Sequence, residues 1–256
     1  MIQVSGLSKT FHDRKKGDIP AVSGVSFTCR PGEVFGLLGR NGAGKTTTLR
    51  MLATILVPTG GTAVVAGYDI VQKPAEVRRR IGYLSGDTKL YDRLTGRELL
   101  QYFGALAGMP KSSIGARVEE LTAPFGLADL LDTRIGKMST GMKQRVSIAR
   151  VVFHDPQVLI FDEPTAGLDV IGARNVLGLI QDLKGKGRTV IFSTHIMTEA
   201  ERICDEIAII ERGAILTEGS LEAVRGSGRR PLEDVFVEVV GASAGAEGNG
   251  HYGAGR

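Results

Sequence analysis

The stretch "GRNGAGKTT", residues 39–47, places three glycines, a lysine and two threonines between an apolar run and an amphipathic segment. Residues 39–46 fit the pattern G-x-x-x-x-G-K-[ST], and residues 33–39, "EVFGLLG", have the continuous apolar character of a buried parallel strand. Leucines at helical spacing follow the loop. A flexible glycine turn with a chance lysine is the alternative, and the strand before and helix after it argue against that. The stretch therefore predicts a phosphate-binding loop.

Each residue type in this loop suits a nucleotide. Glycines allow successive backbone N–H groups to turn toward a phosphate chain, and the helix that follows points its positive end at the same place. Lys45 supplies a charge for the β- and γ-phosphate oxygens, and the Thr46 hydroxyl is a candidate Mg²⁺ ligand. The glycines do not form G-x-G-x-x-G, so a dinucleotide Rossmann site is disfavoured. The expected nucleotide-binding residues are Gly39, Arg40, Asn41, Gly42, Ala43, Gly44, Lys45, Thr46 and Thr47.

Two carboxylates end a second apolar run, "VLIFDE", residues 158–163. Ligands of open α/β sheets bind at the carboxyl ends of the strands, and neighbouring side chains on a strand point to opposite sides. We therefore expect Asp162 to hold Mg²⁺ through water and Glu163 to polarise the attacking water. His195 ends a third apolar run, "TVIFSTH", in the same way. A lone histidine at a strand end is more often structural, but this parallel placement makes it a candidate catalytic residue.

Composition limits the remaining possibilities. The 256 residues are 42% hydrophobic, and 32 basic residues against 28 acidic ones leave a net charge of +4, too small and dispersed to indicate nucleic acid. Cys29 and Cys204 lack metal-ligand spacing and are expected to be buried thiols. No apolar stretch is long enough to cross a bilayer, and the first residues do not resemble a signal peptide. These features predict a cytosolic chain.

The order of the patterns predicts an α/β fold. A parallel sheet is expected to hold the phosphate loop, with an antiparallel β subdomain early in the chain and an inserted helical subdomain at about 88–150. Thr95 and Glu98 fit a capping box inside this insert. From about Gly241 the sequence becomes rich in Gly and Ala, and we expect disorder there. The expected strands are residues 2–11, 21–29, 33–39, 61–67, 157–164 and 189–195, with a hairpin at 207–216 turning near Arg212 and Gly213.

The segment "MSTGMKQRVSIAR", residues 138–150, identifies a family resemblance. It resembles the LSGGQ signature of the ATP-binding subunits of ABC transporters, with Met138, Ser139, Thr140, Gly141 and Met142 in those places. "FDEPTAGLD", residues 161–169, is similar to that family's Walker B motif and D-loop. His195 matches its switch histidine, and Phe11 stands where the family has an aromatic ring on adenine. The resemblance covers about residues 1–225 and implies a P-loop NTPase with a RecA-like parallel sheet core, followed by a C-terminal extension at 226–256.

The resemblance also implies cofactors and partners. ATP and Mg²⁺ would bind, and Ser139 with the backbone of Gly141 would form a second anion site at a helix N-terminus. In the family this site faces the γ-phosphate held by a partner subunit, so two copies in a two-fold homodimer would enclose two ATP molecules. A separate transmembrane permease would hold the pair on the inner face of the cell membrane, and its helices would dock near residues 85–100. No nucleic acid is expected.

The sequence departs from the family pattern at two places. Thr140 and Met142 replace the usual glycine and glutamine of the signature, while Ser139 and Gly141 are kept. In "IGYLSGD", residues 81–87, Gly86 stands where the family usually has a glutamine that ligates Mg²⁺ and senses the permease. Asp87 is the adjacent carboxylate that could replace it. Slow hydrolysis or altered coupling is the expected consequence.

Several functions remain open at this level. The first is the ATPase subunit of an exporter, with sodium or another small cation as cargo, because "SGDTKLYDRLTGREL" and "STGMKQ" most resemble the sodium-efflux branch. Drug, antibiotic or lipid export is the nearest alternative. A non-transport ABC ATPase acting in DNA repair or on ribosomes is another, although such chains usually carry two ATP modules, coiled coils or zinc cysteines. A P-loop kinase or small GTPase would leave the signature helix unexplained.

Overall fold

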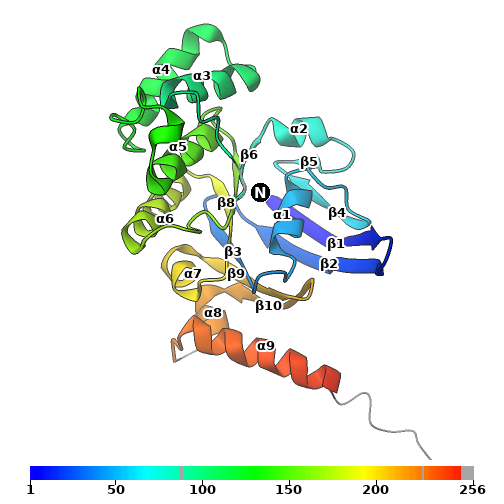
Figure 1. The fold of residues 1–256 in the computed structure, drawn as a ribbon. Coiled ribbons are helices and arrows are strands. Elements are labelled where there is room, and N and C mark those ends of the chain that lie inside the picture. The colour runs from blue at the N-terminus through cyan, green and yellow to red at the C-terminus, as the bar shows by residue number, and fades with distance from the viewer. Residues whose placement is uncertain (87–88, 227, 249–256) are drawn as a thin grey trace, which may run out of the picture.

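The computed structural model describes residues 1–86, 89–226 and 228–248, and it contains two sheets (Figure 1). The larger sheet has the strand order β10-β9-β3-β8-β7-β6. Its strands are parallel except for β10, which pairs with β9 in an antiparallel hairpin through Arg212 and Gly213, both at positive φ. The strands are β3 (Val34–Leu38), β6 (Ile81–Leu84), β7 (Val158–Asp162), β8 (Thr189–Thr194), β9 (Glu206–Glu211) and β10 (Ala214–Ser220).

The apolar runs of the sequence form β3, β8 and β7 in the middle of this sheet. Apolar side chains suit these positions because both faces of the sheet are covered. Every residue of β3, β7 and β8 is buried, as expected for parallel strands with layers on both sides. The parallel α/β core of the P-loop NTPase class is confirmed.

The smaller sheet is the expected antiparallel subdomain, with strand order β2-β1-β4-β5. Its long hairpin turns at residues 14–16, so both strands extend further than their hydrophobic alternation indicated. Phe27 stacks on Phe35 of β3 with ring centroids 4.9 Å apart, which joins the two sheets. The strands are β1 (Ile2–Asp13), β2 (Gly17–Cys29), β4 (Gly60–Val65) and β5 (Tyr68–Asp69).

Helices α1 (Lys45–Leu52) and α2 (Pro74–Arg78) lie beside these sheets (Figure 1). The inserted helical subdomain forms a separate lobe. Thr95 and Glu98 form the expected capping box at the start of the first inserted helix. Leu99, Val118 and Val146 bury the apolar faces of the inserted helices in one cluster. These helices are α3 (Gly96–Leu106), α4 (Lys111–Thr122), the short 3₁₀ helix η1 (Ile135–Lys137) and α5 (Thr140–Val152).

The C-terminal part corrects one expectation. After α6 (Val170–Gly185), α7 (Met197–Ile203) and α8 (Leu221–Arg225), the chain forms α9 (Leu232–Gly248). Residues 241–248 were expected to be disordered, but they continue this helix. Leu232 and Val235 are buried in the main core, so packing fixes the first turn, and alanine, the best helix former, sustains the later ones. Within the described residues, no helix is long and apolar enough to cross a membrane.

Candidate functional site

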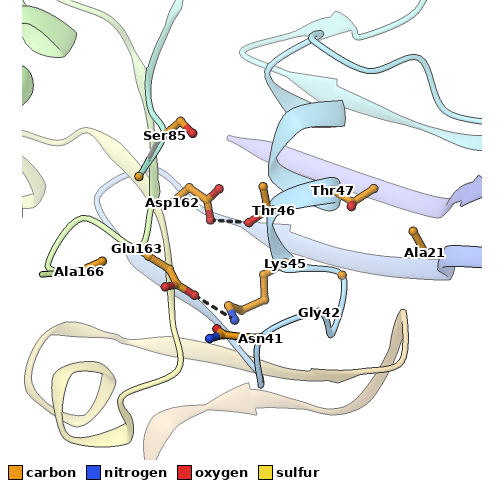
Figure 2. Close-up of a pocket in the computed structure, with 12 residues that line it drawn as sticks. Ala21, Asn41, Gly42, Lys45, Thr46, Thr47, Ser85, Asp162, Glu163 and Ala166 are labelled. Carbon is orange, nitrogen blue, oxygen red and sulfur yellow. Dashed lines mark hydrogen bonds and ion pairs between the residues drawn. The ribbon is translucent and has the colours of Figure 1, made fainter. Parts of the chain in front are cut away.

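A cavity of about 450 Å³ lies where the phosphate loop meets the carboxyl ends of β6 and β7 (Figure 2). Parallel strands end at one edge of the sheet, so Gly39 after β3, Glu163 after β7 and His195 after β8 come together from distant parts of the chain. The cavity is lined by Ala21, Asn41, Gly42, Gly44, Lys45, Thr46, Thr47, Ser85, Gly86, Asp162, Glu163 and Ala166.

Two glycines of the loop are required by geometry. A Cβ at Gly39 would lie 2.4 Å from the carbonyl oxygen of Ile210, so no side chain fits between β3 and β9 there. Gly44 caps the N-terminus of α1 with φ 111°, a left-handed conformation that side chains disfavour. The loop therefore turns its backbone into the cavity and starts α1 with free N–H groups aimed at it.

Lys45 is held in place by the loop itself. Its side chain is only 4% exposed, and Nζ donates to the carbonyl oxygens of Gly39 and Arg40 at 2.7 and 3.1 Å. The same Nζ lies 3.2 Å from Glu163 Oε1. A buried cation without an incoming anion needs such partners, and phosphate oxygens could take their place. Lys45 is thus positioned to bind an anionic ligand within the cavity.

Asp162 and Thr46, the two residues expected to bind Mg²⁺, lie in hydrogen-bond contact. Thr46 Oγ1 donates to Asp162 Oδ1 at 3.2 Å, and Ser193 Oγ donates to the same oxygen at 2.7 Å. Burial raises the pKa of the Asp162 carboxyl, while the hydrogen bonds from Ser193 and Thr46 lower it. A hydroxyl and a carboxylate are hard oxygen donors, the type that Mg²⁺ prefers, and both belong to residues that line the cavity. These residues fit Mg²⁺, with phosphate and water oxygens completing its shell.

Glu163 points away from Asp162, as the strand pattern predicted (Figure 2). Its backbone has φ 49°, and its N–H donates to both the carbonyl and the hydroxyl of Ser193, at 3.2 and 3.1 Å. This strained turn directs the carboxylate between Lys45 and His195, whose Nδ1 is 3.3 Å from Glu163 Oε2. The structure therefore places both expected catalytic residues in contact.

A buried acid that the sequence analysis missed braces this site. Glu199 of α7 accepts hydrogen bonds at Oε2 from Thr165 at 3.0 Å and from Thr194 at 2.8 Å. It thereby ties the loop after Glu163 to the residue before His195. A single glutamate on a short helix gives no periodic signal, and only its position four residues after His195 pointed to it. Gln144 of α5 supports the same loop by donating to the carbonyl oxygen of Pro164.

The second expected anion site is separate from the first. Ser139 caps α5, and its Oγ accepts from the Met142 N–H at 3.3 Å. Ser139 and Gly141 line a cavity of about 540 Å³ between the start of α5 and residues 167–176, and this cavity shares no lining residue with the phosphate cavity. The chain thus presents two half-sites facing different spaces.

Two further residues singled out by the sequence lie outside this cavity or outside the described residues, and a third lines the cavity. Phe11, expected to stack on adenine, is on β1 under the Nζ of Lys9, 5.4 Å from its ring centroid, and does not line the cavity. Its role remains a prediction. Gly86 does line the cavity, and a Cβ there would lie 3.6 Å from the Asp162 carbonyl oxygen, so the space for a side chain exists. Asp87 falls outside the described residues.

Known proteins match this arrangement. Residues 22–166 match the family model "ABC transporter". The chain is 47% identical to the ABC transporter ATP-binding protein NatA of Bacillus subtilis, over 93% of this chain and 97% of that protein. It is 38% identical to the doxorubicin resistance ATP-binding protein DrrA of Mycobacterium tuberculosis, over 93% of this chain and 70% of that one. A solved ATP-binding subunit of an ABC transporter superposes with a TM-score of 0.82 at 30% identity, covering 94% of this chain and 99% of that one.

Proposed function

The chain belongs to the ABC transporter family of ATP-binding subunits, and from that premise we propose that it is the ATPase of an export system whose membrane-spanning part is another chain. The observation that carries this proposal is the position of Glu163, held between Lys45 and His195 beside the Asp162–Thr46 pair. That edge of the sheet combines a phosphate cradle, a metal-binding pair and a base.

The residues divide the work of ATP hydrolysis. Loop N–H groups and Lys45 hold the phosphates, and Thr46 and Asp162 would hold Mg²⁺, which would supply neutralisation of the phosphate charge. The Glu163 carboxylate orients the attacking water and accepts its proton, and His195 holds that carboxylate in place. A positioned base of this kind contributes about 10²–10⁴ in rate.

The two half-sites support a homodimer as the working form. Ser139 and Gly141 offer a capped helix N-terminus to an anion, but they line a different cavity from Lys45. In a head-to-tail pair, the Ser139 tip of one copy would close on the phosphate cavity of the other. ATP would then stabilise the closed pair, and hydrolysis would remove those contacts and release it.

A third cavity supports docking to a permease. It measures about 840 Å³ and lies between α2 and β6 on one side and the ends of α3 and α5 on the other, flanking the segment near residues 85–100. Arg78 and Arg79 stand at one wall, and Leu106 at the other is 69% exposed. This combination suits a short permease helix with an apolar face and acidic flanks, and it would place the chain on the inner face of the membrane.

The substitution Glu163→Gln tests the ATPase and the dimer together. It removes the base while keeping the side chain's size, so we expect ATP binding to persist, turnover to fall about 10²–10⁴-fold, and ATP-dependent dimers to accumulate. Hydrolysis would be measured by phosphate release and mass by light scattering. Wild-type turnover in this variant would refute the assignment of the base. If the variant with ATP stays strictly monomeric at every protein concentration, even with the permease present, the proposed dimer that encloses two ATP molecules is refuted.

The docking groove is tested with Leu106→Asp. We expect loss of co-purification with the membrane subunit while the ATPase activity of the isolated chain is kept. Ile55→Asp, at another exposed apolar residue outside the groove, is the matched control and should still co-purify. Retention of DNA or ribosomes in place of a permease would favour a non-transport ABC ATPase.

The cargo is proposed from the relatives. The resemblance of residues 85–99 and 139–144 to the sodium-efflux branch favours sodium or another small cation, and the match to a doxorubicin resistance ATP-binding protein keeps drug export as the second candidate. Vesicles containing the chain and its permease would be assayed for ATP-driven transport of radioactive sodium and, separately, of doxorubicin. Transport of sodium alone supports the cation, and transport of the drug alone supports the alternative.

A further inference from the structure

The C-terminal helix α9 is fixed against the helix that follows His195. Figure 1 shows α9 running beneath α7, α8 and β10. Leu232 is fully buried and Val235 nearly so, and both belong to the main hydrophobic cluster that also contains Met197 and Ala200 of α7. The Leu232 N–H donates to Glu201 Oε1 of α7 at 2.6 Å. The first turn of α9 therefore has a defined seat on α7.

The seat of α9 matters because α7 begins two residues after His195. Glu199 of α7 already fixes Thr194 and Thr165, on either side of the Glu163–His195 pair. Arg225 of α8 reaches Glu201 at 3.6 Å, so α7, α8 and α9 meet at this one acid. The C-terminal helix thus packs on the element that carries the site histidine.

One side chain of α9 reaches the site itself. Phe236 lines a cavity of about 340 Å³ together with His195 and the first residues of the phosphate loop, Gly39, Arg40 and Asn41. The His195 side chain is 44% exposed, and its polar partner Glu163 lies 3.3 Å away on one side of the ring. A half-exposed imidazole with one polar contact retains rotamer freedom unless an apolar wall limits it. Phe236 is the apolar side chain in the wall of this cavity, which His195 also lines.

We propose that Phe236 is a positioning residue for ATP hydrolysis, acting by holding His195 in the orientation that keeps it against Glu163. This inference rests on the proposed ATPase function. It makes α9, which lies beyond the segment matched by the family model, a structural part of the nucleotide site. Because Phe236 carries no polar group, its contribution falls on the geometry of the base and not on phosphate binding.

The substitution Phe236→Ala tests the proposal. Loss of the wall frees His195, and small displacements of catalytic groups are costly, so we expect kcat to fall on the order of tenfold. KM for ATP and the affinity for ATP measured by calorimetry should stay at wild-type values, because the loop amides and Lys45 are unchanged. Phe236→Leu, which keeps an apolar wall, should restore most of kcat.

The matched control is Val237→Ala, the next residue on the same helix, about 100° around the helix axis from Phe236, whose side chain is 65% exposed. It should match the wild type in kcat. Equal kcat in Phe236→Ala and wild type would overturn the proposal. A second result would also overturn it: Phe236→Ala loses kcat, binds ATP more weakly and melts at a lower temperature, and Phe236→Leu restores none of these. Phe236 would then have only a structural role.

These outcomes separate the two levels of inference. Absence of ATP hydrolysis by the wild type, or full hydrolysis by Glu163→Gln, counts against the proposed function. Normal hydrolysis by the wild type, its loss in Glu163→Gln and no effect of Phe236→Ala count against the role of Phe236 alone.

Discussion

Two helix N-termini in this molecule are suited to anions, and they are built in opposite ways. The N-terminus of α1 begins at a left-handed glycine, leaves its first N–H groups free, and lies beside a lysine that is 4% exposed. The N-terminus of α5 is capped by Ser139, which already accepts from Met142, and the cation that lines its cavity, Arg145, already donates to the Gly126 carbonyl oxygen at 3.0 Å. In the proposed dimer, the first would hold the phosphates of ATP with groups of one chain, and the second would reach a phosphate only when a partner chain presents it.

The difference indicates which helix N-terminus contributes to ATP binding by the monomer and which contributes to formation of the closed pair. A ligand gains most of its contacts from the α1 cradle before any partner arrives, because charge, dipole and backbone amides are already oriented. The α5 tip adds contacts only when a second surface presents a phosphate to it. Variants at the α1 cradle should therefore affect binding by the monomer, and variants at the α5 tip should affect only the closed pair.

The largest effect is expected for Lys45→Ala. Charge-assisted hydrogen bonds contribute about 1.5–3 kcal/mol each, so ATP affinity should fall by about 100-fold or more. Calorimetry with the monomer would measure it, and unchanged affinity would refute the phosphate-loop interpretation. Lys143→Ala, at a partly exposed lysine in the first turn of α5 that pairs with Asp92 at 3.6 Å, is the control and should bind ATP normally.

A smaller effect is expected for Ser139→Ala. We expect kcat to fall about tenfold, the loss of one hydrogen bond to a charged group, with the ATP affinity of the monomer unchanged. Ser220→Ala removes a similar cap from α8, where Ser220 Oγ accepts from Ala223 at 3.1 Å, and should leave kcat intact. Weaker ATP binding by the Ser139→Ala monomer would break the contrast between the two helix tips.

A substitution at Gly86 should strengthen Mg²⁺ binding at the α1 site. Gly86→Gln would place an amide oxygen beside the Asp162–Thr46 pair, where a Cβ has room. We expect the Mg²⁺ concentration for half-maximal hydrolysis to drop by up to about tenfold, the low end for gaining one contact near a metal. Calorimetric titration of Mg²⁺ into the ATP complex gives an independent measurement. Gly86→Ala adds bulk without an oxygen and should show no such gain.

The smallest effect concerns stability and not either anion site. The pKa of His154 is lowered, because the effect of burial is larger than that of the hydrogen bond to the Ile81 carbonyl, which favours the charged ring. The neutral ring then favours the folded state: this contribution is complete above the ordinary pKa of histidine and is lost as the pH falls below it. The melting temperature should decline on acidification, and His154→Gln should show a shallower decline. An unchanged slope would contradict this account.

The sequence predicted the elements whose signals are local. The phosphate loop, the two acids at the end of β7 and the capping box at Thr95 each depend on residues within a few positions of one another, so spacing alone located them. Glu199 and Phe236 were missed because their roles arise from tertiary packing, which brings α7 and α9 to an edge formed by other segments. The expectation of disorder was wrong for residues 241–248, because composition ignores the buried first turn of α9, and residues 249–256 lie outside the described part of the chain.

The strand order of the larger sheet has a consequence for biosynthesis. β3 leads into the phosphate loop near the start of the chain, but its two neighbours, β8 and β9, are encoded far later, at Thr189–Thr194 and Glu206–Glu211. A nascent polypeptide therefore carries the loop through most of translation without the backbone partners that shape it. Long-range parallel pairing is slow to form and leaves apolar strands exposed meanwhile. The phosphate loop is therefore translated early but is among the last parts of the chain to reach its folded conformation.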